Sequence, residues 1–138
     1  MDKVALDAYL FFDGTCREAM GFYKNVFGGN LEMQTYDEVP GDMPGKDRMK
    51  GKIIHASLRG GEVTLMGSDT HDKMLGAGKI ELSLSGNDEE KLRKIFDGLS
   101  AGGRVKSPLQ KEFWGDTFGS LTDKFGVDWM VNIAAKKE

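Results

Sequence analysis

Disulfides and membrane helices are the first structures that the sequence excludes. It has one cysteine, Cys16, so no disulfide can form within the chain, and we expect a protein of the reducing cytoplasm. No apolar run approaches the roughly 20 residues that a membrane helix needs. The first residues have neither the charged part nor the apolar part of a signal peptide. We therefore expect neither a secreted protein nor a membrane protein.

An excess of positive charge is also missing. The 19 basic residues stand against 22 acidic ones, which gives a net charge of −3 at pH 7. A nucleic-acid-binding domain concentrates basic residues on one surface, so we expect no nucleic-acid partner. The 138 residues, 39% hydrophobic and 30% charged, suit one folded domain or two small fused modules.

Several motifs of catalysis and cofactor binding are absent as well. The sequence has no glycine-rich phosphate-binding loop, no His-Glu-x-x-His helix, no Cys-x-x-Cys pair and no serine nucleophile elbow. A methyltransferase of the nucleotide-binding type would need a glycine-rich turn between a strand and a helix. We therefore expect that the protein is not a methyltransferase.

Two segments carry the pattern of an amphipathic helix. Thr15 and Glu18 predict a capping box at the start of the first, and Asn87 and Glu90 predict one at the start of the second. Apolar residues follow each cap at helical spacing, and a pair of glycines ends each segment. The two predicted caps lie 72 residues apart, just over half the chain, which indicates an internal duplication.

Apolar runs with alternating polarity predict four strands around each helix. The expected strands are 4–12, 31–36, 52–58 and 63–66 in the first half, and 80–84, 105–113, 118–121 and 127–133 in the second. Each half reads β-α-β-β-β, which predicts an α+β fold. We expect a single domain over residues 1–138, made of module 1 (about 3–68) and module 2 (about 78–135). Residues 67–78 are the expected linker, and residues 37–51 form a long loop.

Three motifs are distinctive when they occur together: the pair Phe22-Tyr23, the pair Trp114-Gly115, and the Asp-x-Phe-Gly turn at 123–126. With the paired modules, they make the sequence resemble the vicinal oxygen chelate superfamily of glyoxalase I, extradiol dioxygenases and bleomycin-resistance proteins. The match is nearest to its PhnB-like, glyoxalase-like branch. The resemblance implies tandem modules that form a partly open curved sheet with a cleft for a metal or an elongated ligand. It also implies a homodimer.

The resemblance also names four cleft positions that hold metal ligands in metal-using members. In this sequence those positions are Ala8, His55, Glu81 and Met130. His55 and Glu81 can bind a divalent ion such as zinc, nickel, manganese or iron, whereas Ala8 cannot and Met130 is a poor ligand for such an ion. No cofactor is therefore certain, and the resemblance implies at most a weak metal site at His55 and Glu81.

Three functions stay open: two involve an unidentified small molecule, and the third is that of a dimeric scaffold without a small-molecule site. The first is a glyoxalase-like lyase or a related metal-assisted activity, with His55 and Glu81 as the acid–base pair. The second is a metal-free protein that sequesters an aromatic or antibiotic-like ligand. In both, Trp114, Phe118 and Met130 are the expected ligand-binding residues.

Other aromatic residues of the second half, among them Phe113, Phe125 and Trp129, are expected mainly in the core. Cys16 lies near the start of the first predicted helix, where the helix dipole lowers the pKa of a thiol. No histidine lies near it in the sequence, so we interpret it as a packing residue.

Overall fold

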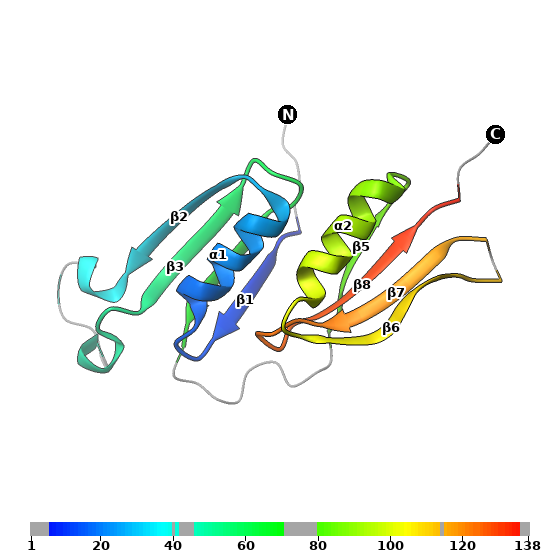
Figure 1. The fold of residues 1–138 in the computed structure, drawn as a ribbon. Coiled ribbons are helices and arrows are strands. Elements are labelled where there is room, and N and C mark those ends of the chain that lie inside the picture. The colour runs from blue at the N-terminus through cyan, green and yellow to red at the C-terminus, as the bar shows by residue number, and fades with distance from the viewer. Residues whose placement is uncertain (1–5, 40, 42–45, 71–79, 114, 136–138) are drawn as a thin grey trace. The chain divides into compact units, whose positions relative to one another are not determined.

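The computed structural model describes residues 6–39, 41, 46–70, 80–113 and 115–135. The chain divides into two compact units, residues 1–75 and 76–138 (Figure 1). The first contains β1 (Ala8–Phe12), α1 (Cys16–Phe27), β2 (Asn30–Thr35), β3 (Ile53–Arg59) and β4 (Leu65–Asp69), with short 3₁₀ helices at Tyr36–Glu38 and Lys46–Met49. The second contains β5 (Leu82–Gly86), α2 (Glu89–Ser100), β6 (Arg104–Lys111), β7 (Thr117–Thr122) and β8 (Asp128–Ile133).

Each unit is built on one mixed sheet of four strands. The strand orders are β1-β4-β3-β2 and β5-β8-β7-β6, so the two units have the same topology. In each sheet the first strand along the chain pairs in parallel with the fourth, β1 with β4 and β5 with β8. The remaining pairs are antiparallel. The predicted α+β class and the tandem β-α-β-β-β modules are confirmed.

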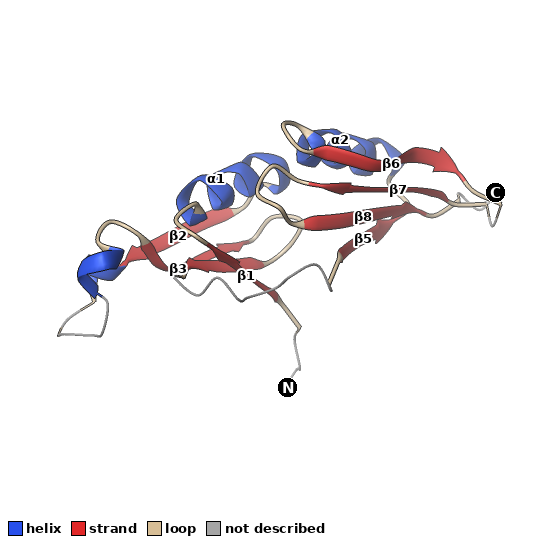
Figure 2. Cartoon of the chain, turned by 90° about the horizontal axis from the view of Figure 1, so that it is seen from below, coloured by secondary structure: helices blue, strands red, loops and turns tan. Residues whose placement is uncertain are grey.

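Each helix covers one face of its own sheet (Figure 2). Both helices have 12 residues, and α2 starts 73 residues after α1. The helix and the sheet residues beneath it form the core of each unit. Fully buried side chains include Met20, Tyr23 and Leu58 in the first unit and Leu99, Leu121 and Val131 in the second. Among the described residues, no helix is long and apolar enough to cross a membrane.

The helix starts are close to the predicted ones, and Thr15 is the N-cap residue of α1 as predicted, but neither predicted capping box forms. Thr15 makes no capping hydrogen bond through its side chain, and the first amide of α1, at Cys16, instead donates to Oδ1 of Asp69 at 2.9 Å. The cap of α2 is Asp88, not Asn87, and its carboxylate accepts a hydrogen bond from the Lys91 amide at 3.1 Å. A short acidic side chain fills the capping role in both units.

The strand boundaries also differ from the predictions by one to a few residues, and the differences at β5 and β4 change where predicted segments lie. β5 begins at Leu82 because its pairing with β8 begins there, and Ile80, the first residue of the predicted strand, lies ahead of it and is 79% exposed. β4 continues to Asp69 because it pairs with β1 as far as Phe12. Residues 67–69 therefore belong to the sheet and not to the predicted linker, while residues 71–78 of that linker lie outside the described part.

Candidate functional site

The side of each sheet opposite the helix of the same unit is called here its open face. On the open face of the first sheet, β1 presents Tyr9 and Phe11, which are 38% and 52% exposed. Their ring centroids lie 5.1 Å apart. The Tyr9 hydroxyl lies 3.0 Å from Nδ1 of His55 on β3, and the two ring centroids are 5.8 Å apart. Two aromatic rings and an imidazole thus form one surface.

The strand register explains why Tyr9 and His55 meet although they are far apart in the sequence. β4 lies between β1 and β3, and Met66 of β4 is the partner of both Tyr9 and Ser57. Residues two apart on a strand share a face, so His55 lies on the same side as Ser57. The alternation that puts Tyr9 on the open face puts Ala8 on the face covered by α1. Ala8, the first position that the family resemblance indicated, is therefore a neighbour of the site residue Tyr9 and not part of the open face.

A cation lies on the same face. The Nη2 atom of Arg59, the last residue of β3, lies 3.6 Å from Sδ of Met66. Among the described residues, the guanidinium of Arg59 has no carboxylate partner within ion-pair distance. Tyr9, Phe11, His55, Met66 and Arg59 are called the aromatic site below.

The open face of the second sheet has a different chemistry. Glu81 lies just before β5, and its carboxylate accepts a hydrogen bond from Nζ of Lys106 at 3.1 Å. The same Nζ lies 3.5 Å from Oδ1 of Asp128, which also accepts a 2.6 Å hydrogen bond from the Thr122 hydroxyl. The partner of Glu81 within its own unit is thus Lys106, whereas the sequence analysis paired Glu81 with His55. His55 belongs to the first unit and Glu81 to the second.

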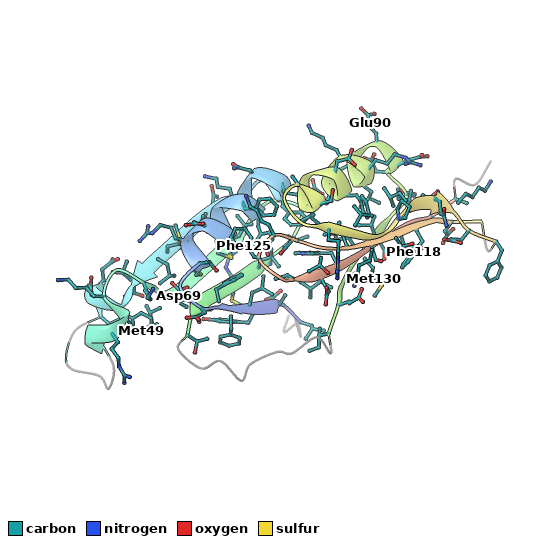
Figure 3. The ribbon with its side chains drawn as sticks, turned by 60° about the horizontal axis from the view of Figure 1, so that its bottom comes forward. Met49, Asp69, Glu90, Phe118, Phe125 and Met130 are labelled. Atoms are coloured by element: carbon teal, nitrogen blue, oxygen red, sulfur yellow. The ribbon has the colours of Figure 1, made fainter. Side chains whose placement is uncertain are left out.

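The predicted ligand-binding residues Phe118 and Met130 both lie on the open face of the second sheet, on neighbouring strands (Figure 3). Met130 is the partner of Ser83 on β5 and of Ser120 on β7. Trp114, the third residue of that prediction, lies outside the described residues.

The prediction that the other aromatics are mainly core residues is correct only in part. Trp129 is 1% exposed, and its Nε1 donates to Oδ2 of the buried Asp123 at 2.9 Å. Phe125 is half-buried. Phe113 is 96% exposed, because β6 ends at Lys111 and Phe113 follows it.

Cys16 is fully buried, as expected for a packing residue. The predicted lowering of its pKa is wrong. Burial, together with the nearby Asp69 carboxylate, raises the pKa of the thiol to about 12, because both disfavour the thiolate. The pKa of Tyr36 is also raised, through burial, Asp69 and Tyr9, and its hydroxyl donates to the carbonyl oxygen of Asp69 at 3.0 Å. Neither group is suited to act as a nucleophile at neutral pH.

Within each unit, the described residues do not bring together the donor set of a divalent metal centre. Within the described ranges, no group of three His, Cys, Asp or Glu side chains comes together. His55 already engages Tyr9 through Nδ1, and Glu81 is paired with Lys106. A protein metal site normally needs three or four such ligands, with the remaining positions filled by water or substrate.

Tyr9, Phe11 and Arg59 are site residues that the sequence analysis missed. The signal was present, because the run 8–12 alternates between small or aliphatic residues and aromatic ones, apart from Phe12 at its end. Reading that alternation as two faces would have singled out Tyr9 and Phe11. Nothing in the sequence indicates that the side chain of Arg59 reaches Met66.

The comparisons with known proteins agree with this architecture. Protein YjdN of Escherichia coli K12 is 30% identical over 146 residues, which cover 96% of this chain and 97% of that protein. Protein PA1353 of Pseudomonas aeruginosa has a crystal structure that matches with a TM-score of 0.82 and 37% identity, over 97% of this chain and 100% of that one. A Bacillus cereus PhnB protein, described as a putative 3-demethylubiquinone-9 3-methyltransferase, matches with a TM-score of 0.73 and 27% identity, over 95% and 100%. The family model of the Glyoxalase/Bleomycin resistance protein/Dioxygenase superfamily matches residues 5–131, and the chain belongs to that superfamily.

Proposed function

We propose that this protein binds a small, planar organic molecule at the aromatic site, without a resident metal ion. The observation that carries the proposal is the pair of exposed rings, Tyr9 and Phe11, beside the imidazole of His55. Aromatic rings that gather on an exposed surface, together with a few polar groups, are typical of ligand sites.

The chemistry of the site suits a flat ligand. Aromatic rings attract one another when their centroids lie about 4.5–7 Å apart, so Tyr9 and Phe11 would offer a platform for a further ring. The hydroxyl of Tyr9 and the ring nitrogens of His55 add polar atoms that can orient the ligand. A platform with a polar side would give both affinity and a preferred orientation.

A second candidate is metal-assisted glyoxalase-like catalysis, with His55 and Glu81 as catalytic and metal-binding residues. One observation favours it: Nε2 of His55 has no hydrogen-bond partner among the described residues, so it is free to bind a ligand. Glyoxalase-like chemistry needs a Lewis acid and a carboxylate base. The ion pair of Glu81 with Lys106 would have to open before Glu81 could bind a metal.

We also propose that the protein forms a homodimer, as the family resemblance implies, and that it is located in the cytoplasm, as the single cysteine suggests. The support is the presence of exposed large hydrophobic side chains, among them Leu6, Ile80 and Val105. Exposed apolar surface favours association with another chain. Light scattering on the purified protein tests the proposal, which predicts a mass twice that of one chain.

The test of the binding function uses three naphthalene probes of the same shape: 1-naphthoate, 1-naphthamide and 1-naphthylmethylamine. Titration followed by nuclear magnetic resonance (NMR) should show at least one probe shifting the resonances of Tyr9, Phe11 and His55. Tyr9→Ala with Phe11→Ala should abolish that binding. Phe113→Ala, which removes an exposed aromatic of the second unit, should leave it unchanged.

Metal analysis separates the two candidates. Nickel, zinc, manganese and iron are added separately to the untagged protein, which is then dialysed. The binding function predicts no retained metal and unchanged probe binding after treatment with a chelator. One equivalent of metal for each chain, lost in both His55→Ala and Glu81→Ala, would refute the metal-free proposal and support the enzyme.

A further inference from the structure

We infer that the ligand of the aromatic site is a planar anion, one oxygen of which accepts a hydrogen bond from Nε2 of His55, and that Tyr9 is the residue that positions His55 for this contact. The inference rests on the proposed binding function and adds to it the chemical class of the ligand.

The hydrogen bond between Tyr9 and His55 fixes which nitrogen of the imidazole carries the proton. A neutral imidazole has one donor nitrogen and one acceptor nitrogen. The Tyr9 hydroxyl lies 3.0 Å from Nδ1, and an imidazole nitrogen is a stronger base than a phenolic oxygen, so the hydroxyl donates and Nδ1 accepts. The proton of the ring is then on Nε2. His55 therefore presents an N–H donor to a ligand, not a lone pair.

The neighbours of Tyr9 hold this arrangement in place. The Phe11 ring, 5.1 Å away between centroids, packs beside Tyr9 on the same strand. The Tyr9 and His55 rings lie 5.8 Å apart at an interplanar angle of 37°. Because these contacts restrict the Tyr9 ring, its hydroxyl stays directed at Nδ1. A donor held in one orientation selects ligands with a matching acceptor, such as a carboxylate or enolate oxygen.

A cation that can contact an anionic ligand lies near the aromatic rings. The guanidinium of Arg59 reaches Sδ of Met66. Because Met66 is the strand partner of Tyr9, the guanidinium lies one strand away from Tyr9. Two acidic residues lie on or beside this face: Asp7, two residues before Tyr9 in the chain, and Glu32 on β2. β2 is three strands from β1, which places Glu32 about 14 Å from the Tyr9 strand at the usual strand spacing. The Arg59 guanidinium is therefore nearer to the Tyr9 strand than the Glu32 carboxylate is, and with no carboxylate partner among the described residues it is available to a ligand anion.

The tautomer of His55 is tested first, on the protein without ligand. The chain has two histidines, so ¹⁵N spectra of the imidazole rings contain two sets of signals, and His71→Gln assigns them. We expect His55 to be protonated on Nε2 in the wild type, and Tyr9→Phe, which keeps the ring, to produce a mixture of tautomers. A His55 protonated on Nδ1, or a Tyr9→Phe spectrum identical to that of the wild type, would overturn the positioning role.

The charge preference is tested with the three naphthalene probes. We expect 1-naphthoate to bind about tenfold more tightly than the neutral amide, as is usual for hydrogen bonds to a charged group, and the amine to bind most weakly. Arg59→Gln should reduce the advantage of the carboxylate, because the hydrogen bond from Nε2 of His55 remains while the positive charge is lost. Lys111→Gln, which removes one positive charge from the end of a strand in the second unit, should preserve it.

The outcomes separate this inference from the function on which it rests. Equal binding of naphthoate and naphthamide at the aromatic site would overturn the inference and leave the binding function intact. No effect of any probe on the resonances of the aromatic site would overturn both. A reduced naphthoate preference in Lys111→Gln as well as in Arg59→Gln would show a general charge effect and would overturn the role of Arg59.

Discussion

The two modules share a topology and a helix length, but their open faces differ. β1 and β5 occupy the same place in their sheets, and where β1 has Tyr9 and Phe11, β5 has Ser83 and Ser85. The side chains that face the helices are apolar in both modules, because burial restricts them there. The duplication has thus kept the interior and changed the surface, and the surface of the first module carries the candidate site.

The buried carboxylates differ as well. Asp69 joins three segments of the first module: its oxygens accept from the amide of Cys16, at the start of α1, and from the amide of Ile53, at the start of β3, each at 2.9 Å. Asp123 organises a single turn and the strand after it, through the amides of Phe125 and Val127 and through Trp129. The first module is therefore held by a contact between distant residues, and the second by local ones.

The largest effect is expected from Asp69→Asn. The amide group keeps the shape of the side chain but replaces one acceptor oxygen by an NH2 donor, which faces a backbone N–H and leaves it without an acceptor. We expect a loss of about 3 kcal/mol in the free energy of unfolding, measured by urea titration. Hydrogen exchange should locate the new exposure at the start of α1 and of β3.

Asp123→Asn is the matched change in the second module. The side-chain oxygen of asparagine can still accept from both turn amides, so the loss is limited to the hydrogen bond from Trp129. We expect a smaller destabilisation, of about 2 kcal/mol. Equal losses of unfolding free energy in Asp69→Asn and Asp123→Asn would contradict the view that the contact between distant residues contributes more to stability than the local one.

The next effect is confined to alkaline pH. The pKa of Cys16 is raised to about 12 in the folded protein, from an ordinary value of 9.0, so above pH 9 the unfolded chain loses this proton while the folded chain keeps it. The contribution of the thiol to stability is therefore complete below pH 9 and is lost as the pH rises toward 12. Unfolding measured from pH 8 to pH 11 should show a steeper decline for the wild type than for Cys16→Ala. Parallel curves would show that the thiol has no such shift.

The sequence predicted the secondary structure of both modules because each element has a strong period. The stripe that includes Met20 and Tyr23 could only be a helix, and the alternation at 127–133 could only be a strand with one buried face. The acceptor for the first amide of α1 could not be predicted. It is Asp69, which lies 53 residues from Cys16 and is brought there by the pairing of β4 with β1.

The candidate site was predicted less well than the fold. His55 was named from the sequence, but its partner was sought at Glu81, whereas within its own unit it pairs with Tyr9. The resemblance to metal-using relatives directed attention to Ala8, one residue away on the opposite face of the strand. A shift of one residue exchanges the faces of a strand, so a position carried over from relatives needs the register of the actual sheet.

The difference between the open faces of the two sheets gives a further prediction, about ligand binding. Tyr9→Ser with Phe11→Ser gives β1 the residues that β5 has at the same places. We expect the affinity for 1-naphthoate, measured by calorimetry, to fall at least about tenfold, because both rings and the partner of His55 are lost. The free energy of unfolding should change little, since both side chains are exposed. Ser83→Ala with Ser85→Ala is the control and should bind the probe like the wild type.

The smallest effect is expected in the polar cluster of the second module. Lys106→Met removes the cation between Glu81 and Asp128 and leaves two carboxylates without it. All three side chains are partly exposed, so we expect a loss of less than about 1 kcal/mol, and less still in high salt. The affinity for 1-naphthoate should not change, because the binding residues lie in the first module. A large drop in affinity for the probe would mean that the second face takes part in binding, and the contrast between the two modules would then describe two parts of one site.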